Sequence, residues 1–164
     1  MPITNQVQTQ ATCERAASAC RRFSGIAQSL APVFLLAVRL YWSWQFAQTG
    51  WGKLQHLPRV TGFFASLGIP APGFSAVAIA CLEFVGGIFL ALGLASRFWA
   101  LLLVCDMIGA YVTAGRGNLL AIFSDPGKFY GDDAFTFLFA SLIVLIFGPG
   151  KISIDELMVR RFAR

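Results

Sequence analysis

The sequence offers few groups that could hold a redox centre or a metal ion. His56 is its only histidine, so the chain cannot supply both axial ligands of a haem that is held by two histidines. Its 4 cysteines form no CxxC pair and no iron–sulfur spacing. We therefore expect no haem, iron–sulfur cluster or metal site bound by this chain alone.

Charged residues are also scarce. They make up 13% of the 164 residues, whereas hydrophobic residues make up 57%, and the charged share is about half that of soluble proteins. A single domain of this length cannot bury so many apolar side chains in a water-soluble fold. The composition therefore excludes an ordinary soluble enzyme, and its wealth of apolar side chains excludes a disordered chain.

A basic stripe with interleaved aromatic residues, which is the footprint of a nucleic-acid-binding protein, is missing too, although the net charge is +5. Lys and Arg stand instead where hydrophobic segments end. This placement is typical of a polytopic membrane protein, whose cytoplasmic loops are rich in Lys and Arg. The expected partner is a lipid bilayer and not a nucleic acid.

Hydrophobic segments of sufficient length to cross a bilayer occur four times, given a hydrocarbon core of about 30 Å and a helical rise of about 1.5 Å per residue. They cover about 30–51, 74–95, 97–115 and 133–150. The first loop contains RVTGFFASLGIPAP, a short apolar stretch followed by turn-forming residues, which predicts an interfacial helix and a turn. The predicted fold is all-α, an antiparallel bundle of four transmembrane helices with this interfacial helix in its first loop.

Three regions follow from this pattern: a cytoplasmic N-terminal tail at 1–22, a four-helix membrane domain at 23–155 and a basic cytoplasmic C-terminal tail at 156–164. The first 22 residues lack the apolar core of a signal peptide, so we expect this tail to be retained. Outside the predicted spans, 8 Lys and Arg residues lie on the side of the two termini and 4 on the opposite side. The excess predicts that both termini are cytoplasmic.

Ionisable residues interrupt three of the spans. Arg39, Glu83 and Asp106 each lie about nine residues into a span, which places all three near the midplane of the bilayer. A charge at that depth costs about 2.5–3.5 kcal/mol on insertion scales, so such groups normally face the bundle interior and pair. We expect Arg39 to pair with Glu83 and Asp106 to complete a polar cluster. This cluster either holds the helices in register or carries function.

Small residues recur on the predicted helices at spacings that let backbones approach closely, which favours helix packing. The expected packing positions are Gly50, Gly86, Gly87, Gly93 and Gly109.

The chain resembles the DoxX family of small four-helix membrane proteins, from about Arg39 to Asp155. The residues that carry the resemblance occur in order in VRLYWSWQF, TGWGKL, FFASLGIPAP, LEFVGGIFLALGLASR and FGPGKISID. The resemblance implies a multi-pass protein of the bacterial inner membrane. It also implies relationship to small subunits of quinone-linked oxidoreductases and to components of oxidative-stress complexes.

A quinone would need an apolar cleft with a few polar groups. Trp42, Gln45, Lys53 and His56 could line such a cleft near the outer face of the membrane. The aromatic residues are equally compatible with an aromatic belt at the interface, and His56 with a surface position.

The function expected from the sequence is that of an accessory subunit in a quinone-linked redox complex. The catalytic cofactor would belong to a periplasmic or cytoplasmic partner. The alternative is a non-catalytic transporter, or a binding or assembly scaffold, that uses the charges of Arg39, Glu83 and Asp106. A homo-oligomer is compatible with either function.

Overall fold

The computed structural model describes the backbone of residues 3–162 and the side chains of 20–25 and 28–162. The chain divides into two units, 1–34 and 35–164. The described part is helical, and the predicted C-terminal tail at 156–164 ends beyond it. Its helices are α1 (Ile3–Gln55), α2 (Leu57–Ser66), α3 (Pro72–Leu92), α4 (Ser96–Thr113), α5 (Arg116–Leu120), α6 (Pro126–Tyr130), α7 (Asp133–Phe147) and α8 (Ile154–Phe162).

Three helical segments of the described chain are long and apolar enough to cross a membrane. They are Cys20–Gln55 within α1, Pro72–Leu92 and Ser96–Thr113, and they correspond to the first three predicted spans. The fourth predicted span, 133–150, is shorter than expected, because α7 is an apolar helix of 15 residues that ends at Phe147. The helix stops where Gly148 adopts a φ of 79° and Pro149 lacks a backbone N–H to continue it.

Local sequence signals explain several helix ends. Pro72 lies in the first turn of α3, where a missing N–H costs nothing, and Gly93 ends the helix with a φ of 70°. The Asp132 side chain caps α7 by accepting a hydrogen bond from the backbone N–H of Ala134 at 3.0 Å. The short helix predicted in the first loop exists as α2.

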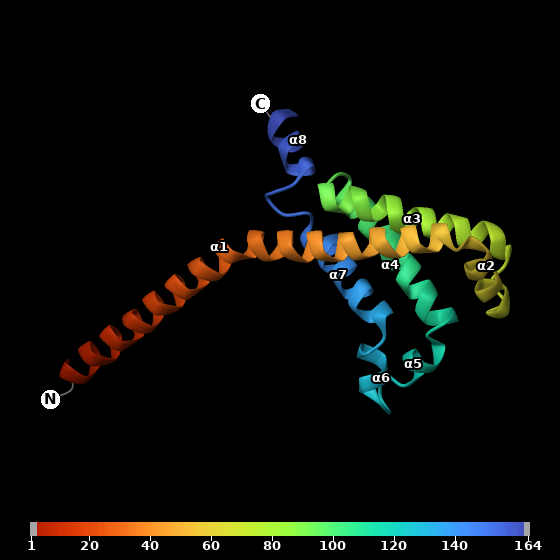
Figure 1. The fold of residues 1–164 in the computed structure, drawn as a ribbon. Helices are drawn as coiled ribbons and strands as arrows, with labels where there is room; N and C mark the ends of the chain where they lie inside the picture. The colour runs from red at the N-terminus through yellow and green to blue at the C-terminus, as the bar shows by residue number, and fades with distance from the viewer. Residues whose placement is uncertain (1–2, 163–164) are drawn as a thin grey trace. The chain divides into compact units, whose positions relative to one another are not determined.

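In the unit formed by residues 35–164, α4 packs against both α3 and α7, and α2 packs against α3 (Figure 1). The α2 helix follows α1 and lies beside the N-terminal part of α3. The core consists of Phe46 on α1, Leu90 on α3, Val144 on α7 and three residues of α4, namely Ala100, Leu103 and Met107.

Large apolar side chains remain outside this core and are exposed on the long helices. Examples are Trp44 on α1, Ile88 on α3 and Leu101 on α4, with exposed fractions of 62%, 40% and 48%. A surface this apolar is unfavourable in water but suits contact with lipid chains.

Candidate functional site

The crossing of α1 and α3 is unusually close because two glycines lie in it. A Cβ atom at Gly50 would collide with the backbone of Ala80 and Phe84 on α3. A Cβ atom at Gly87 would lie 2.7 Å from the backbone of both Ser43 and Ala47 on α1. Close backbone approach through glycine is a common way to pack helices in membranes, and here it fixes the register between α1 and α3.

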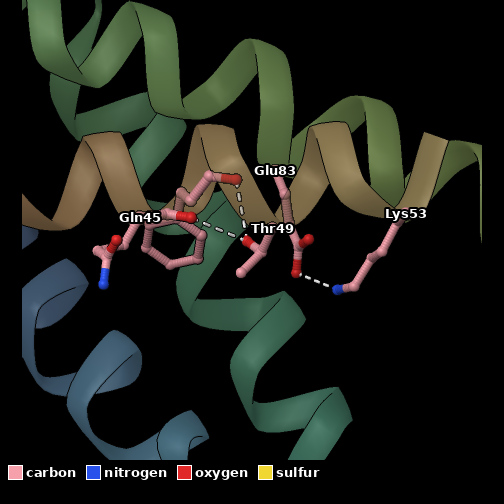
Figure 2. Close-up of polar contacts among 5 residues, drawn as sticks. Gln45, Thr49, Lys53 and Glu83 are labelled. Carbon is pink, nitrogen blue, oxygen red and sulfur yellow. Dashed lines mark hydrogen bonds and ion pairs between the residues drawn. The ribbon is translucent and has the colours of Figure 1, made fainter. Parts of the chain in front are cut away.

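That register brings Lys53 on α1 to Glu83 on α3. The Lys53 Nζ atom donates to the Glu83 Oε1 atom at 2.5 Å (Figure 2). The Lys53 side chain is 31% exposed and the Glu83 side chain 2% exposed. A buried carboxylate is tolerable when a cation pairs with it, so this ion pair explains how Glu83 can lie within an apolar helix.

The predicted pair of Arg39 with Glu83 is therefore wrong. Arg39 precedes Lys53 by 14 residues, or about 21 Å along the helix. Because Gly50 lies opposite Phe84, the end of α1 meets the middle of α3, and Arg39 lies at the level of Gly93. The pairing was predicted because Arg39 and Glu83 lie equally far into their predicted spans. The bounds of α1 differ from those of its predicted span, so equal distance along the two spans did not mean equal depth in the folded protein.

Asp106 on α4 joins Lys53 and Glu83. It interacts electrostatically with both residues. The carboxyl groups of Asp106 and Glu83 also share a side-chain hydrogen bond, which requires a proton between them. Among the described residues no donor from another side chain or from the backbone reaches the buried Glu83 Oε2 and Asp106 Oδ2 atoms. We call Lys53, Glu83 and Asp106 the charged triad; two members of the predicted polar cluster thus meet, with Lys53 in the place expected for Arg39.

The charged triad lies in the wall of a cavity of about 630 Å³ formed by α1, α2, α3, α4 and the α2–α3 loop. Among the described residues that line it, only the triad and Thr113 carry polar side chains. The other lining residues are Val60, Phe63, Phe64, Leu67, Gly68, Ile69, Pro70, Ile79, Leu82, Leu102, Cys105, Met107, Gly109, Ala110 and Ala114. A cavity of this size, with apolar walls and a few polar groups, has the character of a small-molecule site.

Arg39 lies outside the charged triad and binds the segment 148–153, which follows α7. Its Nη1 atom donates to the Pro149 carbonyl oxygen at 2.5 Å and its Nη2 atom to the Ile152 carbonyl oxygen at 2.8 Å. The residue is 3% exposed. A planar guanidinium suits two parallel acceptors, so Arg39 serves as a clamp between α1 and the segment 148–153.

Asp155 completes the attachment of that segment, although it was not among the predicted site residues. Its carboxylate oxygens accept hydrogen bonds from the backbone N–H groups of Ala95 at 2.7 Å and Ser96 at 2.9 Å, at the start of α4. Its own N–H donates to the Gly93 carbonyl oxygen at 2.9 Å. A carboxylate at a helix N-terminus satisfies N–H groups that have no partner within the helix. The signal in the sequence was FGPGKISID, in which an acidic residue follows a glycine- and proline-rich turn.

The four residues expected to contact a quinone are not gathered in one place. Lys53 alone among them lines the cavity. Trp42 packs edge-on against Phe137, with ring centroids 5.2 Å apart. The Gln45 backbone carbonyl accepts a hydrogen bond from the Thr49 hydroxyl within α1 (Figure 2).

His56 is exposed, and its Nδ1 atom lies 3.0 Å from the Gly52 carbonyl oxygen at the link between α1 and α2.

A second, more open cavity of about 380 Å³ is formed by Trp44, Ala47, Gln48, Trp51 and Phe84.

Of the other predicted packing glycines, Gly86 and Gly93 lie close to neighbouring side chains, whereas Gly109 does not. A Cβ atom at Gly86 would lie 3.3 Å from the Trp99 ring, and one at Gly93 would lie 2.6 Å from the Ser153 Cβ atom. Gly109, by contrast, has open space where a side chain would be and lines the cavity instead. The packing role expected for Gly109 is therefore wrong.

Comparison with known proteins gives a consistent result. The DoxX family model matches residues 34–116, which include the charged triad and Arg39. An uncharacterised membrane protein of Mycobacterium tuberculosis, Rv3486, is 30% identical over 142 residues, which cover 79% of this chain and 84% of that protein. A shorter match of 64 residues at 38% identity covers 39% of this chain and 46% of a Bacillus subtilis protein named "Putative oxidoreductase CatD". No solved structure matches the chain significantly.

Proposed function

The chain belongs to the DoxX family of membrane proteins, and from this premise we propose that it is an accessory subunit of a quinone-linked redox complex in the bacterial inner membrane. The observation that carries the proposal is the apolar cavity with the charged triad in its wall. A quinone has an apolar tail and a ring with polar oxygens, and the cavity offers matching surfaces for each. The name of CatD, a relative over part of this chain, is consistent with a redox setting.

The proposed topology has four antiparallel spans with both termini in the cytoplasm. The α7 helix has 15 apolar residues, and we propose that it spans with the help of flanking residues and side chains that reach toward the interface. The amphipathic α2 helix would then lie at the outer interface, where it forms one wall of the cavity.

In this proposal the chain binds and orients the quinone, and the partner subunit holds the electron-transfer cofactor. The Lys53 ammonium group has N–H donors beyond the one used by Glu83, and these can reach a quinone oxygen in the cavity. The apolar residues of α2 and α4 exclude water from the ring.

We predict that purification from native membranes in mild detergent recovers quinone with the protein. The Glu83→Gln variant should retain about one tenth of the bound quinone or less. It replaces the carboxylate that holds Lys53 in the cavity wall, and a hydrogen bond to a charged group contributes about 1.5–3 kcal/mol. Mass spectrometry of the purified sample measures both the quinone and the partner subunits. Glu156→Gln is the matched control, since Glu156 pairs with Arg160 on α8 and does not line the cavity.

Two outcomes would contradict the proposal. Quinone-free protein recovered as a bare oligomer, together with solute flux in vesicles, would favour a transporter. Unchanged quinone content and thermal stability in Glu83→Gln would remove the charged triad from the site.

A further inference from the structure

We propose that Glu83 and Asp106 hold one exchangeable proton between them and supply it to the ligand in the cavity. The proposal rests on the proposed function in one respect, because the ligand is the quinone assigned to the same cavity. The proton itself follows from the contacts within the charged triad and does not depend on which ligand binds.

The two carboxyl groups come from neighbouring helices. Glu83 lies on α3 and Asp106 on α4, and their side chains share a hydrogen bond. An ionised carboxylate accepts hydrogen bonds and donates none, so a bond between two carboxyl groups exists only when one of them carries a proton. Apart from the Lys53 ammonium group, no donor of the described residues reaches the buried oxygens of the pair. The shared proton is therefore what satisfies them.

Charge balance favours the same state. Lys53 contributes one positive charge, and the pair with a single proton contributes one negative charge, so the triad sums to zero. Lys53 and Glu83 are the charged groups that interact with Asp106, and the residues of α2 in the cavity wall have no ionisable side chain. Cys105 is the other titratable residue in the wall. Apolar surroundings penalise a net charge, so one proton is favoured over none or two.

The shared proton is accessible from two sides. All three members of the triad line the cavity, so an oxygen of a bound ligand can reach the pair. The Lys53 side chain is 31% exposed, whereas that of Glu83 is 2% exposed. The ammonium group thus links the buried pair to water, from which a lost proton can be replaced. Ionisable residues that face a cavity within a membrane domain are typical of proton pathways.

The proton balance of quinone reduction gives the pair a role. Conversion of a quinone to its quinol takes two electrons and two protons and forms two O–H bonds. The electrons come from a flavin, haem or iron–sulfur centre of the partner. The carboxyl pair donates one proton to the quinone oxygen beside the triad and regains it from water through Lys53, and a second proton from water completes the other O–H bond. A positioned acid accelerates such a step by about 100- to 10,000-fold.

Infrared spectroscopy of the full chain in lipid nanodiscs at neutral pH counts the protons. A protonated carboxyl group has a C=O stretching band that an ionised carboxylate lacks, and carbon-13 in the aspartate side chains separates Asp106 from Glu83. We expect one protonated carboxyl group in this pair, with a band that shifts in heavy water. Asp125→Asn is the matched control and should leave the band unchanged, because Asp125 is exposed and pairs with Lys128 outside the cavity.

Three variants test the charge balance. Glu83→Gln and Asp106→Asn each leave a single carboxyl group beside Lys53, where it can remain an ionised partner of the ammonium group, so the band should disappear in both. Lys53→Met removes the positive charge, so both carboxyl groups should carry a proton and the area of the band should double. An ion pair that only holds the helices together, with both carboxyl groups ionised, gives no band in the wild type.

Two measurements connect the proton to the ligand. Binding of a decyl benzoquinone should shift the band, because a quinone oxygen then lies beside the pair, whereas decylbenzene has the same tail without an oxygen and should not. In native membranes, the partner should reduce the bound quinone at least about tenfold more slowly in Asp106→Asn than in the wild type or Asp125→Asn. The rates are compared per bound quinone, so that a loss of affinity does not count as a loss of proton transfer.

The possible failures are distinguishable. Absence of the band in the wild type, or a band that persists in both Glu83→Gln and Asp106→Asn, would overturn the shared proton whatever the cavity binds. A band with the expected variants but without quinone binding would contradict the proposed function, and with it the transfer to a quinone. An unchanged rate per bound quinone in Asp106→Asn would show that the pair is not the proton donor.

Discussion

Replacement of Gly50 by alanine is expected to lower the free energy of unfolding by about 3 kcal/mol, the upper part of the range for overpacked positions. The added methyl group would meet the backbone of Ala80 and Phe84, which cannot rotate away as a side chain can. The helices α1 and α3 must therefore separate or slide. Thermal unfolding of the purified protein in detergent measures the loss, and quinone content measures the accompanying displacement of Lys53 from Glu83.

Gly52→Ala is the matched control for this prediction. Gly52 lies two residues further along α1, and nothing lies within 4 Å of the position that its Cβ atom would occupy. Alanine is intrinsically more favourable than glycine in a helix, so this variant should be neutral or slightly stabilising. Equal stability of the two variants would mean that the close crossing of α1 and α3 does not exist in the folded protein.

Replacement of Arg39 by methionine is expected to lower the free energy of unfolding by at least about 3 kcal/mol. Methionine keeps much of the apolar stem but removes both hydrogen bonds to the carbonyl oxygens of Pro149 and Ile152, and bonds from a charged donor contribute about 1.5–3 kcal/mol each. We expect the segment 148–153 to detach from α1. Thermal unfolding and limited proteolysis of this segment measure the two effects.

Two further variants sharpen the result. Arg39→Lys keeps the charge but cannot reach both acceptors with one planar group, so its stability should lie between those of the wild type and Arg39→Met. Lys151→Met removes a positive charge from the same segment at an exposed position, and it should change the unfolding free energy by less than about 0.5 kcal/mol. A loss as large in Lys151→Met as in Arg39→Met would mean that net charge, and not the clamp, holds the segment.

The Arg39 clamp and the charged triad also predict different consequences for function. Arg39 contacts backbone oxygens and does not line the cavity. A variant at Arg39 should therefore reduce stability before it reduces quinone affinity. A variant at Asp106 should do the reverse.

The sequence was a good guide to features that depend on neighbouring residues. Of the four predicted spans, three correspond to helices that are long and apolar enough to cross a membrane, and the short apolar stretch before Gly68 predicted α2. The small residues predicted close packing at Gly50 and Gly87, because only a residue without a side chain allows two backbones to meet. It was a poorer guide to α7, whose end is set by Gly148 and Pro149 within what looked like one apolar span.

The sequence by itself thus determined the class of protein, since apolar composition and helix length are properties of each segment alone. The tertiary structure decided which charges meet, because that depends on the register between helices, and the register is set by the close backbone contacts of Gly50 and Gly87. It assigned Glu83 to Lys53 and left Arg39 to hold the segment after α7. It also made a cavity from α1, α2, α3 and α4, whose lining residues are far apart in sequence and share no local signal.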